Sequence, residues 1–299
     1  MSRTVTTDNT AAPAVSTAPR TAVRVDRGLR KSAVYIVLIV CSILAIAPLW
    51  WMLATALMTN AQLYSRDLQF FPNPITFENF PRSMVQSNFP RYFINTVGLE
   101  AVVLVGTVLS CSIVAYSFAR IPWPGRDTMF ILVIATIILP PQVTIIPLFI
   151  LFRNLGWINT YLPFIVPAFL AASPLSIFLI RQYMRSIPAE LSDAGRIDGC
   201  SEFRLFWNII LPLCQPSLAA VAIFAFVSTW NDFLHPLIYL QKGDLRTVAV
   251  GLFFFQNESG VDLTRLMAAS TVTLMPILIV FALFQRYFIQ GITVTGMKG

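Results

Sequence analysis

Charged residues are scarce in this chain of 299 residues: Asp, Glu, Lys and Arg make up 12% of it, whereas 56% of it is hydrophobic. Soluble domains carry about 25% charged residues. The shortage excludes an ordinary cytosolic globular enzyme and a disordered chain. The 21 basic and 14 acidic residues give a formal charge of +7. In so apolar a chain, this excess indicates membrane topology rather than nucleic-acid binding.

Residues that build common active sites are also few. The single histidine, His235, argues against a His-rich metal site and against a Ser–His–Asp triad. The four cysteines, Cys41, Cys111, Cys200 and Cys214, form no C-x-x-C pair, so neither a disulfide framework nor a zinc site is supported. The chain has no H-E-x-x-H motif and no G-x-x-x-x-G-K-[ST] phosphate loop. The sequence therefore lacks the catalytic and metal-binding motifs that an intramembrane enzyme would need.

Long apolar runs, by contrast, are abundant. A helix needs about 20 apolar residues to cross about 30 Å of hydrocarbon. Six segments meet this length, so the sequence predicts an all-α, polytopic membrane protein with six transmembrane helices. The predicted spans are approximately residues 32–58, 92–118, 128–151, 161–180, 213–240 and 266–284.

Prolines interrupt several of these spans, among them Pro140, Pro141 and Pro147 in the third and Pro236 in the fifth. A proline inside a membrane helix frees a backbone carbonyl, which must find another partner. Two interpretations remain open. The prolines bend helices in a packed bundle, or they break helices around a translocation path.

Basic residues set the expected orientation. Five of them crowd residues 20–31, just before the first span, which predicts a cytoplasmic N-terminus. Six crossings then return the C-terminus to the same side of the cell (inner) membrane. Residues 1–31 have no apolar period and are expected to be a disordered cytoplasmic tail, followed by a transmembrane domain over residues 32–299.

The longest inner loop, residues 181–212, has strong local signals. Pro188 suits a first helical turn, Gly199 can adopt positive φ and end that helix, and Ser201 can cap a second helix. Pro212 marks the entry to the fifth span. The loop predicts a helix, a glycine turn and a second helix. The expected apolar positions are Leu191, Ala194 and Ile197 on the first helix, and Phe203, Phe206, Trp207 and Ile210 on the second.

Such a module has two physical interpretations. It rests on lipid as an interfacial amphipathic helix, or its small residues let a partner protein approach closely, with Asp193 and Asp198 as charge contacts. The residue pattern favours neither.

The spacing within this loop resembles the EAA loop of ABC importer permeases. The acid, the alanine, the glycine turn and the Ile-x-Leu-Pro end all fall at the family's spacing. Aspartate stands in place of the usual glutamate at position 193, and glycine in place of the second alanine at 195. The matching residues are Asp193, Ala194, Gly195, Gly199, Ile209, Leu211 and Pro212.

Further segments resemble the carbohydrate-uptake, maltose-type branch of these permeases, and within it the G-type subunit. They are Asn95-Thr96, residues 230–233 (WNDF), Met267-Ala268-Ala269 and the C-terminal segment 291–299. The resemblance covers roughly residues 33–299. It implies the transmembrane-domain fold of type I ABC importers.

The resemblance also implies docking sites. The loop 186–212 is expected to seat in a cleft of a cytoplasmic ATPase, through the matching residues above and Asp198. The tail 286–299 is expected to insert between two ATPase subunits, through Gly296, Met297, Lys298 and Gly299; a solvated tail is the alternative. The outer segment Gln256, Asn257, Glu258 and Ser259 aligns with the loop that enters the binding protein's sugar site, and a solvated loop tip is the alternative.

Trp230, Asn231 and Asp232 are candidates for a translocation path or gate, because an aspartate in a membrane segment usually faces protein or a water-filled path. Packing at the membrane interface is the alternative, and direct sugar binding by Asn231 and Asp232 is not favoured. Glu100 is ambiguous in the same way, and His235 is expected to be a packing residue.

The predicted function is a permease subunit of an ATP-driven, binding-protein-dependent sugar importer. The expected partners are a second homologous permease, two ATPase subunits that hold ATP and Mg²⁺, an extracytoplasmic sugar-binding protein and membrane lipid. This chain is expected to bind no cofactor, metal or nucleic acid and to catalyse no reaction. The alternatives are an ion-coupled carrier, a structural membrane subunit, and a permease of the same family for glycerol phosphate or another polyol.

Overall fold

The computed structural model describes residues 20–66, 69–86, 88–258 and 262–296, and every regular element in these ranges is helical. Internal contacts divide the chain into two units, Met1–Trp51 and Met52–Gly299. The helices up to residue 154 are α1 (Arg20–Ala56), α2 (Asn60–Leu63), α3 (Asn79–Gln86), α4 (Phe89–Arg120), α5 (Arg126–Ala135) and α6 (Pro141–Asn154). After them come α7 (Leu162–Phe169), α8 (Pro174–Ser186), α9 (Glu190–Ile197), α10 (Glu202–Leu205), a π-helical turn (Phe206–Ile210), α11 (Leu211–Leu213), α12 (Gln215–Trp230), α13 (Leu234–Tyr239), α14 (Val248–Glu258) and α15 (Leu263–Gly296).

The six expected crossings become four single helical segments and two bent pairs. By length and composition, the segments 30–56, 89–120, 162–186 and 263–285 can each cross a membrane. The predicted span 128–151 is instead two helices bent by 100°. The bend follows from Pro140 and Pro141, which together remove two backbone N–H donors from the helical ladder.

The predicted span 213–240 also differs in the structure. Its helix α12 ends at Trp230, and α13 is a separate short helix after residues 231–233. Pro236 lies inside α13 and cannot donate to a carbonyl one turn back, which disfavours one continuous helix. Residues 170–173 similarly separate α7 from α8, with Ala171 at a φ of 56°.

The start of the chain differs from expectation as well. α1 begins at Arg20, so residues 20–31, expected to belong to a disordered tail, continue the helix of the first span. Adding residues to an existing helix avoids the cost of nucleation. Residues 1–19 lie outside the described ranges.

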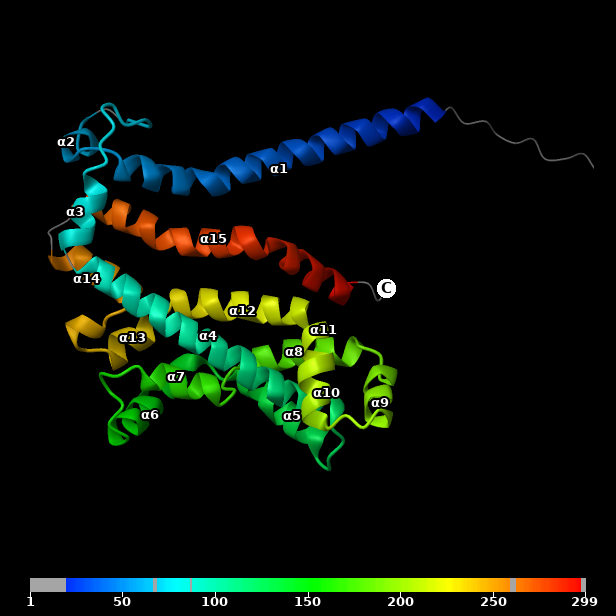
Figure 1. The fold of residues 1–299 in the computed structure, drawn as a ribbon. Helices are drawn as coiled ribbons and strands as arrows, with labels where there is room; N and C mark the ends of the chain where they lie inside the picture. The colour runs from blue at the N-terminus through cyan, green and yellow to red at the C-terminus, as the bar shows by residue number, and fades with distance from the viewer. Residues whose placement is uncertain (1–19, 67–68, 87, 259–261, 297–299) are drawn as a thin grey trace, which may run out of the picture. The chain divides into compact units, whose positions relative to one another are not determined.

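The second unit has two distinct ends (Figure 1). α3, α13 and α14 gather at one end, whereas α9, α10 and α11 lie at the other, toward which the last turns of α15 run. The long helix α4 connects the two ends and packs against α7 and α8. Gly106 permits a close approach to α7, because a Cβ atom there would lie 2.6 Å from Cδ2 of Phe169.

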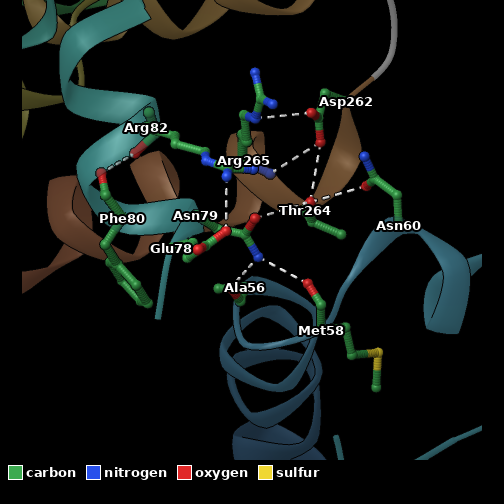
Figure 2. A network of polar contacts seen from close by, with 11 residues as sticks. Ala56, Met58, Asn60, Glu78, Asn79, Phe80, Arg82, Asp262, Thr264 and Arg265 are labelled. Carbon is green, nitrogen blue, oxygen red and sulfur yellow. Dashed lines mark hydrogen bonds and ion pairs between the residues drawn. The ribbon is translucent and has the colours of Figure 1, made fainter. Parts of the chain in front are cut away.

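A polar network ties together the segments at the α3 end (Figure 2). The side-chain amide of Asn79 donates to the carbonyls of Ala56 at 2.8 Å and Met58 at 2.7 Å, just where α1 ends. Thr264, in the first turn of α15, donates to Asn60 and Asn79 at 2.9 and 3.4 Å. Asn79 thereby joins the end of α1 to α3 and α15.

Candidate functional site

The helix, glycine turn and second helix predicted at residues 188–212 are present. α9 ends before Gly199, which has a φ of 79°, in the left-handed region that favours glycine. The N–H of Cys200 then donates to the carbonyl of Gly195 at 2.9 Å and closes the turn. Ser201 caps α10 by accepting from the N–H of Arg204. Both local predictions, the glycine turn and the serine cap, are confirmed.

The predicted apolar face of α9, which was expected to meet lipid or a partner, lies on the outside of this α9–α11 module. On α9, the buried residues are Ser192 and Gly195, whereas Leu191, Ala194 and Ile197 face outward. A Cβ atom at Gly195 would lie 3.2 Å from Ile209 and 3.3 Å from Leu205. An alanine at position 195, which is usual in the family that the loop resembles, would require these two side chains to shift by a few tenths of an ångström.

The second half of the module enters the largest apolar core of the second unit. Leu205, Phe206 and Ile210 are at most 5% exposed and pack in one cluster with side chains of α4, α5, α8 and α12. Each such buried side chain contributes about 1.5–3 kcal/mol. Phe203 and Trp207 instead face outward with their rings stacked. The module is therefore rooted in the protein and presents an apolar outer surface.

A chain of polar contacts links the module to α4. Arg196 donates to Asp193 at 3.0 Å and to Glu202 at 2.8 Å, across the glycine turn. The Tyr116 hydroxyl, on α4, donates to the other oxygen of Glu202 at 2.6 Å. Hydrogen bonds from Arg196 and from Tyr116 hold the pKa of Glu202 below its ordinary value of 4.5. The contacts of its carboxylate are therefore present at neutral pH and are lost only as the pH falls through this lowered pKa.

Two arginines, the buried Arg181 and the partly buried Arg120, join α4 to α8 at the same end of the unit. Arg120, the last residue of α4, donates to the carbonyls of Met184 and Ile187 at 2.6 Å, where α8 ends. Arg181, on α8, donates to the carbonyl of Phe118 near the end of α4 and lies 3.7 Å above the Phe130 ring. Cations favour helix C-termini, where carbonyls lack partners. Each helix is thus capped by an arginine from the other.

A cavity of about 390 Å³ lies midway along α4, beside the breaks in two helices. Val103 and Thr107 of α4, Ala172 and Ser173 between α7 and α8, and Asp232 after α12 all line it. Irregular backbone at membrane depth is tolerated where it is buried in protein or lines a cavity. The proline-interrupted helices therefore surround a cavity here, as broken helices around a path do.

The three residues predicted as a path or gate have separate positions. Asp232 lines the cavity, and its carboxylate lies 2.9 Å from Nδ1 of His235, which lines the cavity too. Trp230 is buried outside the cavity lining and donates to the carbonyl of Thr273. Asn231 donates to Val227 one turn back. His235, which was expected to be a packing residue, thus pairs with Asp232 and lines the same cavity.

The remaining predicted positions are only partly described. Gln256, Asn257 and Glu258 form the end of α14, and Gly296 ends α15. Ser259, Met297, Lys298 and Gly299 lie outside the described residues. Ala194 and Asp198 are exposed on the module, and Pro212 lies within α11. Within the described part of the chain, no group of three or more His, Cys, Asp or Glu residues is placed to hold a metal ion.

The sequence pattern missed five residues that the fold makes prominent: Tyr116, Arg120, Arg181, Arg196 and Glu202. Their partners lie on other helices or across the turn. Charged residues at the ends of apolar runs are the only signal in the sequence, and they indicate membrane topology rather than partners.

Known proteins resemble this chain over most of its length. Residues 106–294 match the family described as binding-protein-dependent transport system inner membrane component. The arabinooligosaccharides transport system permease protein AraQ of Halalkalibacterium halodurans is 38% identical over 259 residues, which cover 86% of this chain and 92% of AraQ. The melibiose/raffinose/stachyose import permease protein MelC of Bacillus subtilis is 31% identical over 280 residues, 91% of this chain and 100% of MelC.

A solved structure shares the fold. A bacterial ABC transporter involved in the import of the acidic polysaccharide alginate contains a chain that superposes with a TM-score of 0.80 and 21% identity. The superposition covers 93% of this chain and 100% of that one. The predicted resemblance to ABC importer permeases is confirmed by the family match and by the relatives. This multi-pass membrane chain belongs to the family of binding-protein-dependent transport system inner membrane components.

Proposed function

We propose that this chain is a non-catalytic permease subunit of an ATP-driven importer that moves a di- or oligosaccharide into the cell by alternating access. The relatives that support a sugar cargo include permeases named for arabinooligosaccharides and for melibiose, raffinose and stachyose. Its partners are a second, homologous permease, two ATPase subunits that bind ATP and Mg²⁺, and an extracytoplasmic sugar-binding protein.

The observation that carries this proposal is that the α9–α11 module has one side buried in the core and an exposed apolar side. Its inner side is rooted in the core through Leu205, Phe206 and Ile210, whereas Ile197 is 86% and Phe203 74% exposed. Exposed apolar side chains gathered on one surface mark interaction sites. A module that rested on lipid alone would need no rigid connection to α4 and α8. The module is the surface that the ATPase grips.

Movement of the module then reaches the cavity through α4 and α8. The Tyr116–Glu202 hydrogen bond and the two arginines connect the module, α4 and α8 at one end. Thr107 of α4 and Ser173, which precedes α8, line the cavity. Closure of the two ATPases therefore rocks both cavity walls between inward-open and outward-open arrangements.

We expect Asp193 to form a charge contact with the ATPase. One of its oxygens accepts from Arg196, and its side chain remains 64% exposed. An exposed carboxylate with free acceptor positions suits a charge contact with the ATPase. Asp193→Ala is expected to leave the complex in the membrane and to lower transport-coupled ATP turnover.

Two further contacts belong to this proposal by resemblance. The segment 256–259 enters the sugar site of the binding protein, and residues 296–299 insert between the ATPase subunits. Deleting residues 257–259 is expected to slow sugar release from the docked binding protein. An unchanged release rate would count against that role.

The experiment that tests the function is uptake by the reconstituted importer. Proteoliposomes that contain this chain, its partner permease, the ATPase and the binding protein are loaded with ATP and Mg²⁺ and given labelled arabinotriose or raffinose. We expect accumulation that requires ATP and the ATPase and survives proton and sodium ionophores. Accumulation that an ion gradient drives without ATP would establish the ion-coupled carrier instead.

A further inference from the structure

We propose that Asn95 and Thr96 are positioning residues that fasten α14 to the first turns of α4, so that the two helices move as one body during transport. α14 lies beside the start of α4 (Figure 1). The inference rests on the proposed function, because α14 ends in residues 256–258, for which contact with the sugar-binding protein is proposed. It adds the connection through which a movement of α4 reaches that contact.

Thr96 holds the first residue of α14. Its side chain is 3% exposed, and its hydroxyl accepts from the N–H of Val248 at 2.8 Å while it donates to the carbonyl of Tyr92 at 2.8 Å. The first N–H groups of a helix have no partner inside that helix, so other groups must satisfy them. The hydroxyl of Thr247, just before α14, has no hydrogen-bond partner among the described residues. α14 therefore takes this cap from α4.

Asn95 holds the segment that leads into α14. Its side-chain amide donates to the carbonyls of Asp244 at 2.9 Å and Arg246 at 3.1 Å. Both N–H groups of the amide are thereby used, on carbonyls two residues apart. Arg91 donates to the same Asp244 carbonyl at 3.1 Å, but its side chain is 59% exposed and contributes less. The segment cannot slide along α4 without breaking the bonds of Asn95.

Gly251 lets the two helices approach closely one turn further on. A Cβ atom at Gly251 would lie 2.4 Å from Cδ2 of Tyr92, a side chain that is 7% exposed. Tyr92 precedes Thr96 by one turn of α4, and Gly251 follows Val248 by one turn of α14. The helices therefore meet at two successive turns, once through a hydrogen bond and once through close packing.

The opposite end of α4 belongs to the joint with the α9–α11 module. Tyr116 of α4 donates to Glu202 of the module there, as described above. α4 is a continuous helix of 32 residues, so it carries a displacement from one end to the other. Movement of the module by the ATPase then moves α14 and the residues at its end. The fastening by Asn95 and Thr96 makes sugar release from the binding protein follow the ATPase cycle.

The first test compares single and combined variants in sugar release. The assembled importer in nanodiscs receives binding protein loaded with labelled arabinotriose or raffinose, and the release rate is measured after ATP is added. Thr96→Val removes the hydroxyl and keeps the branched shape. It should slow release roughly 5-fold, the equivalent of one neutral hydrogen bond. Asn95→Ala should also slow release, and Thr96→Ser should restore a rate near that of the wild type.

A change that acts only through the end of α14 should have no effect once that end is removed. In a chain that lacks residues 257–259, Thr96→Val should therefore slow release no further. A further slowing by the full factor would show that Thr96 acts elsewhere and would overturn the proposal. Wild-type release in both Thr96→Val and Asn95→Ala would overturn it too.

A matched threonine separates this role from general damage. Thr271 is 8% exposed, and its hydroxyl donates to the carbonyl of Met267 within its own helix, α15. Thr271→Val removes the same group without touching the α4–α14 contact and should release sugar like the wild type. Gel filtration checks that every variant assembles. Slowing by Thr271→Val equal to that by Thr96→Val would count against a positioning role.

The second test measures the distance between the two helices directly. Spin labels are attached through Ile94→Cys on α4 and Phe253→Cys on α14, both at exposed positions, in a chain whose four natural cysteines are replaced by serine. The distance should be the same in the nucleotide-free and the vanadate-stalled complex. α14 also packs against α15, so a second pair joins Phe253→Cys to Met275→Cys. A change of the α4–α14 distance beside a constant α14–α15 distance would assign α14 to α15 and overturn the proposal.

These outcomes also separate the fastening from the proposed function. A wild-type complex that imports sugar with ATP while its α4–α14 distance changes keeps the importer and loses the fastening. If removal of residues 257–259 leaves release unchanged, the proposed contact with the binding protein is wrong, and the spin-label distance alone decides whether α14 follows α4. Absence of ATP-dependent import in the wild type would overturn the function itself.

Discussion

Gly199 is the residue on which the shape of the α9–α11 module depends most. Its φ of 79° is strained for residues with a Cβ atom by about 1–2 kcal/mol, and more for β-branched ones, although no neighbouring atom lies within 4 Å of the Cβ position. A substitution there changes backbone conformation rather than packing. A substitution at Gly199 is therefore expected to change the geometry of docking without disturbing the packing of the folded chain.

We predict that Gly199→Val leaves the assembled complex in the membrane and lowers sugar-stimulated ATP turnover several-fold. The strain shifts the turn away from its native conformation, so the module meets the ATPase in the wrong geometry. ATP hydrolysis by the reconstituted importer measures the effect. Gly98→Val is the control, since Gly98 is exposed on α4 without positive φ. Wild-type turnover in Gly199→Val would show that the turn is not the coupling element.

Tyr116 connects the module to α4 through one hydroxyl. Tyr116→Phe keeps the ring that packs against Phe206 and removes only the 2.6 Å bond to Glu202. Because Glu202 is partly exposed, we expect a stability loss below about 1.5 kcal/mol. We also expect more ATP hydrolysed per sugar transported. The measurement is that ratio in proteoliposomes, with Tyr183→Phe as the control, and an unchanged ratio would contradict the role.

At this scale, local chemistry was predictable and tertiary chemistry was not. The glycine turn and the Ser201 cap depend on a few neighbouring residues, and both were predicted from their types. Tyr116 lies 86 residues before its partner Glu202, and Phe118 lies 63 residues before its partner Arg181. No periodicity indicates such pairs. Asp232 and His235 are only three residues apart in sequence, but the cavity that they line is formed together with residues of α4, α6 and α7.

Whole helices show the same division between local and tertiary information. Apolar length predicted spans near 92–118 and 266–284, where α4 and α15 lie. Length alone could not show that the segment near residues 128–151 bends by 100°, because a proline pair permits either a kink or a break. Hydrophobicity likewise placed Leu191 and Ile197 on an apolar face of the first helix without showing what that face meets. Both side chains are exposed on α9, as the proposed docking to the ATPase requires.

Asn79 is the main polar connection between the elements at the α3 end. It is 7% exposed and bonds the carbonyls of Ala56 and Met58 and the hydroxyl of Thr264. We predict that Asn79→Ala destabilises the protein by about 2–5 kcal/mol, because it leaves buried polar groups unpaired. Thermal unfolding of the purified complex in nanodiscs measures this loss.

Arg82→Ala, on the same helix, provides the comparison for Asn79. Arg82 forms an exposed ion pair with Glu78, and such pairs contribute about 0–1 kcal/mol. Its unfolding temperature should stay near that of the wild type. Equal losses in the two variants would show that the network shown in Figure 2 does not hold this end together.

For the whole molecule, the natural cysteines offer a test of orientation. Cys200 is partly exposed in the α9–α11 turn, Cys111 and Cys214 are buried, and Cys41, although exposed, lies within the apolar segment 30–56, where an impermeant reagent does not reach it. We predict that a membrane-impermeant maleimide labels Cys200 in inside-out vesicles and not in intact cells, and that bound ATPase protects it. Cys200→Ser should abolish the signal. Labelling from outside the cell would reverse the proposed topology.

The reciprocal arginines have a consequence for how the molecule deforms. The guanidinium groups of Arg120 and Arg181 stay protonated at any physiological pH, and the backbone carbonyls that they bind are uncharged. A change of pH or of counter-ion therefore does not break these hydrogen bonds. We therefore expect α4 and α8 to keep a fixed relative orientation at this end. If the chain works by the proposed alternating access, we expect the bending to occur at the helix breaks at residues 139–140 and 231–233.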